Sequence, residues 1–81
     1  MKLPRDLSGR KLAGVLCSHF GYLIIHQVGS HIVLESNLPA HHRLAIPDHH
    51  SLRIGTLNSI LRSVARANEV DKSKILTLLK D

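Results

Sequence analysis

The sequence is poor in cysteine and in aromatic residues. Its single cysteine, Cys17, has no partner in the chain for a disulfide bond, which is typical of proteins from a reducing compartment. Phe20 and Tyr22 are the only residues of the Phe, Tyr and Trp group, too few to form the aromatic platform on which proteins stack unpaired bases. No signal peptide is evident and no apolar run is long enough to cross a bilayer, so we expect a cytoplasmic protein.

Acidic residues are also few. The sequence has 6 Asp and Glu against 11 Lys and Arg, a formal net charge of +5 with histidine neutral. Such an excess suits a polyanionic partner, with nucleic acid as the default candidate, although it also serves simply to keep a protein in solution. The charge is unevenly spread, because Glu35 is the only Asp, Glu, Lys or Arg between residues 12 and 40.

A chain of 81 residues corresponds to one small domain, here residues 1–81. Folding buries only about 60% of the surface of so short a chain, so its stability is marginal unless a partner adds to it. Apolar residues at helical spacing predict a first helix over residues 8–20, with Ser8 as its N-cap and Gly21 at its C-terminal end. The clearest helical stripe comes later, in a second helix that begins near residues 55–56.

Three stretches bounded by turn signals read as strands. They are residues 22–28, 31–36 and 43–46. Gly29 and Ser30 match the two-residue turn of a hairpin between the first two. A short third helix follows, with Asp71 or Ser73 as its cap. The order is therefore α-β-β-β-α-α, which predicts an α+β fold with a three-stranded antiparallel sheet and its helices on one face.

The second strand determines how His31 is presented. Side chains alternate across a strand, so if Ile32 and Leu34 face the helices, His31 and Val33 face the open side together with Glu35. His31 is therefore expected beside a tight turn, on the open side of the sheet and accessible to solvent.

Four segments carry a family resemblance. They are LSGRKL at 7–12, GY at 21–22, GSHIVL at 29–34 and IPDHHSLRIGTLNSILR at 46–62. The combination of Gly-Ser-His, Pro-x-His and Leu-x-x-Gly-Thr-Leu-x-x-Ile-Leu-Arg at this spacing resembles the HicA-type toxins, the messenger-RNA interferases of bacterial and archaeal toxin–antitoxin pairs. The resemblance covers most of residues 3–66.

The resemblance implies a fold like that of double-stranded-RNA-binding domains and RNA cleavage without a metal or other cofactor. It implies inhibition by a HicB-type antitoxin protein. It also implies that His31, in the Gly-Ser-His triplet, is catalytic, and it matches the second recurring histidine of the family to His49, a candidate supporting residue.

Metal-independent RNA cleavage can use the ribose 2′-hydroxyl as nucleophile. The reaction needs a base for the hydroxyl proton and an acid for the departing 5′-oxygen, and histidine suits either task because its ordinary pKa is about 6.5. We expect His31 to act as base or acid, while Gly29 and Ser30 let the backbone approach the phosphate closely. The second acid–base group is not identified: His49, His26 and water are the candidates.

RNA binding is expected to depend on phosphate contacts. The candidate RNA-binding residues are Arg10, Lys11, Arg43, Arg53 and Thr56. The N-terminus of the second helix adds free backbone N–H groups. Arg62 and Arg66 either extend this surface or form a solvated helix face.

The adjacent histidines at 41–42 and 49–50 raise the question of a metal site. Zinc sites usually combine histidine with cysteine or carboxylate ligands at fixed geometry, and neither pair matches such a pattern. We interpret them as solvated loop histidines and predict no metal site, with a structural or adventitious metal as the alternative.

The first strand is apolar at residues 23–25, where the family commonly carries charge. An exposed apolar patch on a small domain often marks an interface. We expect Leu23, Ile25 and Val33 to contact the antitoxin beside His31. A second copy of the chain, or surface apolar residues without a partner, are the alternatives.

Three functions are ranked on these observations. The first is an endoribonuclease toxin, the second a non-catalytic module that binds double-stranded RNA, and the third a protein-interaction domain. The Gly-Ser-His triplet favours the first over the others, and the basic helix ends favour the first two over the third.

Overall fold

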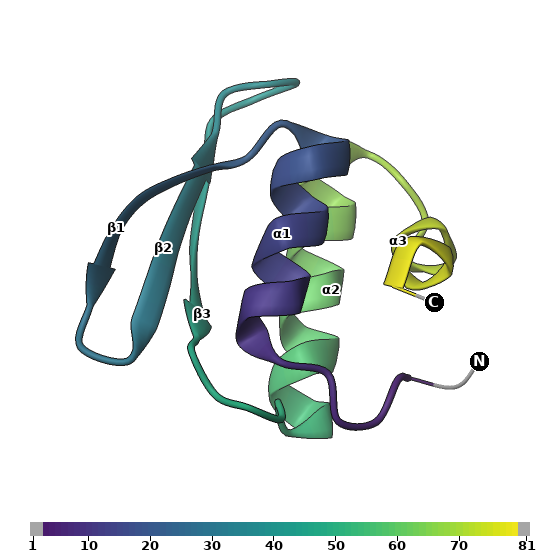
Figure 1. Cartoon of the computed structure of the whole chain (residues 1–81). Helices are drawn as coiled ribbons and strands as arrows, with labels where there is room; N and C mark the ends of the chain where they lie inside the picture. The colour runs from purple at the N-terminus through teal and green to yellow at the C-terminus, as the bar shows by residue number, and fades with distance from the viewer. Residues whose placement is uncertain (1–2, 80–81) are drawn as a thin grey trace.

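The structure, a computed structural model, describes residues 3–79 and contains three helices and three strands (Figure 1). In chain order they are α1 (Gly9–Phe20), β1 (Leu23–Val28), β2 (His31–Ser36), β3 (His42–Pro47), α2 (Ile54–Asn68) and α3 (Lys72–Leu79). This confirms the predicted α+β fold and its α-β-β-β-α-α order. Within residues 3–79, no helix is both long and apolar enough to span a membrane.

The sheet is antiparallel, in the order β1-β2-β3, so β2 is the central strand. Along β2, His31 lies opposite Val28 on one side and Pro47 on the other. The pairing of β1 with β2 shifts between Ile24 and His26, which leaves Ile25 as the extra residue of a β-bulge.

All three helices lie on one side of the sheet (Figure 1). Helix α1 contacts every strand, α2 contacts β3, and α3 packs on α1 and α2. The buried apolar residues form one cluster between sheet and helices, and the apolar stripe predicted for the second helix belongs to it. The stripe residues are Leu57, Ile60, Leu61 and Val64. The other face of the sheet carries no helix and is called the open face below.

Strand β2 alternates as predicted, with one correction. Ile32 and Leu34 belong to the buried cluster, and His31 is exposed. Val33 lies outside the cluster but is only 8% exposed. Val33 lies in the central strand, between His26 of β1 and Ala45 of β3. Because strands flank it on both sides, less of its surface is exposed than the sequence predicted.

The local signals of α1 are confirmed. The Ser8 hydroxyl accepts a hydrogen bond from the Lys11 backbone N–H at 3.1 Å, and Gly21 ends the helix in the left-handed conformation. Element boundaries differ from the predicted ones by one or two residues: β1 begins after the buried Tyr22, β3 extends to His42 and Pro47, and α2 begins at Ile54.

The start of α1 is docked against the segment that follows β3. The Gly9 backbone N–H donates to the His49 carbonyl at 3.0 Å, and the Leu52 N–H donates to the Leu7 carbonyl at 2.7 Å. A β-carbon added at Gly9 would lie 1.9 Å from the Pro47 carbonyl oxygen. Only glycine permits this approach, which fixes the distance between α1 and the end of β3.

We therefore expect Gly9→Ala to lower the free energy of unfolding by about 1–3 kcal/mol, because the clash is with backbone that cannot rotate away. Gly14→Ala, in the same helix, meets nothing within 4 Å and should raise stability by about 0.5–1 kcal/mol. Denaturant unfolding of both variants checks this. A Gly9→Ala protein as stable as the Gly14→Ala protein would contradict the close approach.

Candidate active site around His31

His31 follows directly on the hairpin turn and is exposed. Gly29 has φ 58°, a conformation that glycine adopts without the strain other residues incur, and Ser30 completes the turn. Among residues 3–79 the His31 ring has no hydrogen-bond or ion-pair partner. Both ring nitrogens are therefore available to a ligand.

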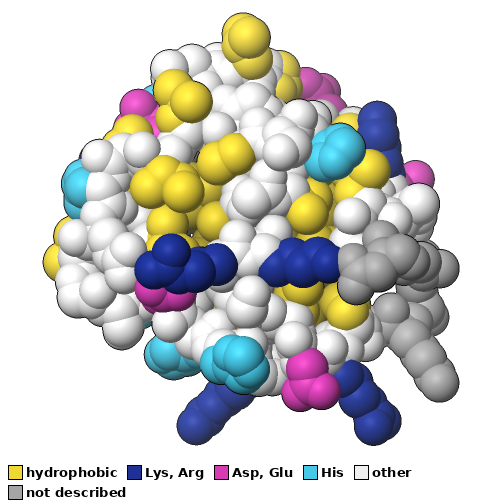
Figure 2. Space-filling view, in the orientation of Figure 1, with side chains coloured by type: hydrophobic (Ala, Val, Ile, Leu, Met, Phe, Trp, Pro, Cys, Tyr) yellow, Lys and Arg dark blue, Asp and Glu magenta, His cyan; other side chains and the backbone are white. Residues whose placement is uncertain are grey.

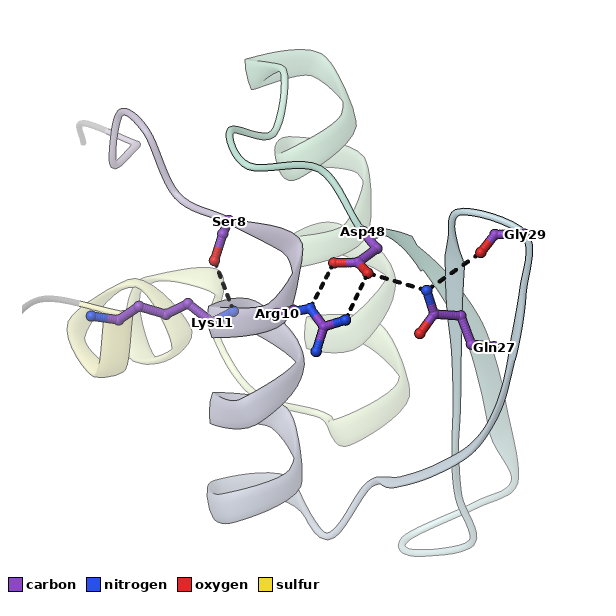
Figure 3. Close-up of polar contacts among 6 residues, drawn as sticks. All are labelled: Ser8, Arg10, Lys11, Gln27, Gly29 and Asp48. Carbon is purple, nitrogen blue, oxygen red and sulfur yellow. Dashed lines mark hydrogen bonds and ion pairs between the residues drawn. The ribbon is translucent and has the colours of Figure 1, made fainter.

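Asp48 holds the turn that carries His31, and Figure 3 shows the bonds of its carboxylate to Arg10 and Gln27. Its backbone N–H donates to the Ser30 carbonyl at 2.6 Å. Its carboxylate accepts two hydrogen bonds from the Arg10 guanidinium, at 3.0 and 3.1 Å, and one from the Gln27 amide at 3.1 Å. The same Gln27 nitrogen also donates to the Gly29 carbonyl at 3.3 Å. Helix α1, strand β1, the turn and the end of β3 are thus joined at one residue.

A shallow hollow of about 540 Å³ lies beside His31, between β3 and the first turns of α2. We call it the His31 hollow; its lining residues are His31, Ala45, Pro47, Gly55, Thr56, Ser59 and Ile60. Helix α2 begins at Ile54 without a side-chain cap, because Arg53 at the N-cap position makes no such bond. The hollow therefore combines an imidazole, two hydroxyl groups and the uncapped N–H groups of a helix N-terminus.

Of the five residues predicted to bind RNA, only Thr56 lines this hollow. Arg10 is paired with Asp48, and Lys11 lies next to it on α1. Arg43 lies opposite Glu35 in the strand register, and Glu35 is four residues along β2 from His31, about 13 Å in a strand. Arg53 lines a different cavity, with Leu3 and Arg5 among its neighbours. In the view of Figure 2, Lys and Arg side chains likewise stand at separate places rather than in one basic patch.

Neither histidine proposed as a second acid–base group lines the His31 hollow. His49 is exposed, is not among the residues that line the His31 hollow, and uses its carbonyl to accept the Gly9 N–H. His26 is exposed on β1 opposite Val33, which makes it a diagonal cross-strand neighbour of His31 on the same face of the sheet. His31 is therefore the one titratable residue in the lining of this hollow.

A polar network that the sequence did not reveal lies further along α2. The Asn68 amide donates to the Tyr22 hydroxyl at 3.1 Å, the Tyr22 hydroxyl contacts His42 Nδ1 at 2.6 Å, and His42 Nε2 contacts the Ser63 hydroxyl at 3.0 Å. Burial lowers the pKa of His42, with a smaller contribution from His41, and burial raises the pKa of Tyr22. The sequence carries no signal for this network, because it predicts Tyr22 as part of the first strand and His42 as a solvated loop residue.

The residues predicted to contact an antitoxin differ in their exposure. Leu23 is 70% exposed and Ile25 40%, whereas Val33 is nearly covered. All six residues of β1 are exposed, so this edge strand contributes nothing to the buried core. Ile24 lies opposite Leu34, on the helix side of the sheet, and is still 55% exposed.

No family model, no curated protein and no solved structure matches this chain. In the part of the chain from residue 3 to 79, no group of three or more His, Cys, Asp and Glu side chains is placed to hold a metal ion. The adjacent histidines do not form such a group: His41 pairs with Glu35 at 3.2 Å, while His42 joins Tyr22 and Ser63.

The lowered pKa of His42 predicts a pH dependence of stability. The unfolded chain takes up a proton at this histidine near pH 6.5, about its ordinary value, whereas the folded protein does so only at lower pH. The free energy of unfolding should therefore fall as the pH drops below about 7, and this contribution should level off below the folded-state pKa. His42→Asn should flatten the curve in that range, and His50→Asn, a substitution in an exposed loop, should not. Urea unfolding between pH 7.5 and 5 measures both; an unchanged slope in His42→Asn would contradict the assignment.

Proposed function

We propose that this protein is a metal-independent endoribonuclease of the HicA toxin type, acting on messenger RNA in the cytoplasm with His31 as its acid–base residue. The observation that carries the proposal is the His31 hollow: an exposed imidazole without an internal partner lines the same hollow as the Thr56 and Ser59 hydroxyl groups and the start of α2. The resemblance of Gly29–Ser30–His31 and of residues 46–62 to the HicA-type toxins points the same way.

The reaction is an internal transesterification. The ribose 2′-oxygen loses its proton to a base and bonds to the adjacent phosphorus, the bond from phosphorus to the 5′-oxygen breaks, and that oxygen takes a proton from an acid. The products are a 2′,3′-cyclic phosphate and a free 5′-hydroxyl. His31 carries one of the two proton transfers. The other is carried by His26, its diagonal neighbour on the open face, or by water.

The remaining lining supports the charge that develops on the phosphate. Thr56 and Ser59 offer hydroxyl donors, and the uncapped first turn of α2 offers backbone N–H groups with the favourable end of the helix dipole. Gly55 adds no side chain that would keep a phosphate away from this turn. These donors lie on the regular part of the fold, so they need little rearrangement to meet the transition state.

His31→Ala should lower the rate of RNA cleavage by about 10²–10⁴-fold, the usual contribution of a general acid or base. His50→Ala, which removes an exposed loop histidine, should leave the rate unchanged. Cleavage of a labelled RNA is followed in the presence of EDTA, with circular dichroism to establish that both variants fold. Undiminished cleavage by His31→Ala would remove the catalytic assignment. RNA that is bound but left intact by the unaltered protein would favour the binding-module alternative.

We further propose that a HicB-type antitoxin binds over β1 and the adjoining part of the open face. The strand exposes Leu23, Ile24, Ile25 and Val28, with 40–70% of each residue accessible. Val28 lies directly opposite His31, so a protein that buries this strand would also limit access to the imidazole. Val33 has too little exposed surface to contribute much.

Leu23→Lys should weaken antitoxin binding by about 30-fold or more, corresponding to the loss of about 2 kcal/mol at an apolar contact in the middle of an interface. Leu38→Lys is the matched control, because Leu38 is 78% exposed but lies in the connection between β2 and β3. Titration of each variant with the purified antitoxin measures the affinity. Equal losses in the two variants, or a loss in neither, would contradict a site on β1.

A further inference from the structure

A second hollow lies along α2, next to the first. It has a volume of about 430 Å³ and is lined by His42, Ser59, Arg62, Ser63, Arg66 and Ala67. We call it the Arg62/Arg66 pocket. Ser59 lines both this pocket and the His31 hollow, so the two adjoin. Thr56 and Ser63 are seven residues apart, about 10 Å along a helix axis, which is short enough for one RNA strand to enter both.

The hydrogen bonds around His42 determine which protons face the pocket. The side-chain nitrogen of Asn68 is identified by its bond to the Val64 carbonyl at 2.9 Å, which can only accept. The same nitrogen donates to the Tyr22 hydroxyl at 3.1 Å, so the Tyr22 oxygen accepts there and its own proton must go elsewhere.

Tyr22 is 1% exposed, and a buried hydroxyl donor needs an acceptor. The partner in place is His42 Nδ1, at 2.6 Å. His42 Nδ1 therefore accepts, and the neutral ring carries its proton on Nε2. Burial favours this neutral form of His42.

His42 Nε2 consequently donates to the Ser63 hydroxyl oxygen, at 3.0 Å. Because that oxygen accepts from the ring, the Ser63 proton is left to donate to another group. The Ser63 hydroxyl thus lines the pocket as a hydrogen-bond donor. Its oxygen is fixed in place by the series of hydrogen bonds that runs from Asn68 through Tyr22 and His42.

The charged residues that line the pocket are both arginines and therefore positive. Arg62 and Arg66 are four residues apart on α2, both are exposed, and neither makes an ion pair with another residue of the range 3–79. No carboxylate lines the pocket. Like charges at this spacing repel and destabilise a helix slightly, and a bound anion would reverse the effect. Guanidinium groups match the geometry of phosphate oxygens and bind them in pairs of hydrogen bonds.

We propose that the Arg62/Arg66 pocket binds a phosphate group of the RNA chain, adjacent to the phosphate that is cleaved beside His31. Arg62, Arg66 and Ser63 donate to its oxygens. The role of RNA as the source of this phosphate rests on the proposed function, whereas the affinity of the pocket for phosphate does not.

The first experiment uses inorganic phosphate alone. Titration into ¹⁵N-labelled protein should shift the signals of Arg62, Ser63 and Arg66, and of the His42 ring, and these shifts should be lost in Arg62→Gln/Arg66→Gln. Ser63→Ala, which removes no charge, should weaken them. Arg5→Gln/Lys74→Gln removes the same charge away from the pocket and should leave them unchanged. Shifts that are absent, or that persist in Arg62→Gln/Arg66→Gln, would overturn the site whether or not the protein cleaves RNA.

The second experiment measures affinity for an RNA oligonucleotide that is 2′-O-methylated and so cannot be cleaved. Arg62→Gln/Arg66→Gln should bind it about 10- to 100-fold more weakly than the unaltered chain, the effect of losing one or two charged hydrogen bonds. Arg5→Gln/Lys74→Gln should lose much less. Equal losses in the two double variants, or phosphate shifts without any loss of RNA affinity in Arg62→Gln/Arg66→Gln, would overturn RNA as the occupant. Specific binding by a protein that never cleaves unmodified RNA would leave the pocket standing and remove the nuclease function instead.

Discussion

Asp48 is the residue on which the arrangement around His31 depends. Its carboxylate and its backbone N–H together make four hydrogen bonds, to Arg10, Gln27 and Ser30. Most of the Arg10 side chain is exposed, at 73%, so this ion pair contributes at most about 1 kcal/mol to stability. Its importance is geometric: it ties α1 to the hairpin turn and to the end of β3, and those three segments decide where the imidazole lies relative to α2.

Helix α2 serves two purposes at once because its faces differ. Leu57, Ile60, Leu61 and Val64 are buried in the core and fix the helix in place. Thr56, Ser59, Arg62, Ser63 and Arg66 line the two adjoining hollows. A ligand that follows the helix would therefore meet donors held by a packed element rather than by a loop. This kind of support reduces the rearrangement that binding requires.

Much of the fold could be predicted from local signals. Ser8 and Gly21 bound α1, Gly29 and Ser30 make the hairpin turn, and Leu57 through Val64 repeat at helical spacing. Each of these acts within a few residues of the chain, so the sequence alone contains it. The exposure of His31 followed from the same logic, because the alternation of β2 depends only on which of its faces is apolar.

The rest of the site depends on contacts between distant parts of the chain. The capture of Arg10 by Asp48 joins residues 38 positions apart, and the Tyr22–His42–Ser63 network joins three separate elements. Contacts between such distant residues leave no periodic pattern in the sequence. Strand register is equally nonlocal: it sets Arg43 far from His31, while the bulge at Ile25 shifts the pairing of β1. A list of basic residues therefore predicted one RNA surface, whereas the fold places those residues apart. Arg62 and Arg66, which line the pocket that adjoins the His31 hollow, were the two with an ordinary alternative explanation.

The bulge in β1 affects how readily the protein aggregates when no partner is bound. An uncharged, exposed strand at the edge of a sheet invites another chain to add its own strand, and repeated addition leads to insoluble assemblies. The sequence LIIHQV has no lysine or proline to act as a gatekeeper against this. An extra residue at Ile25 bends the strand and breaks the even spacing of its outward N–H and C=O groups, so that a straight neighbour cannot pair along its whole length. Strand β1 can thus offer an apolar side-chain surface to a partner protein while the bulge hinders the addition of further strands along its backbone edge.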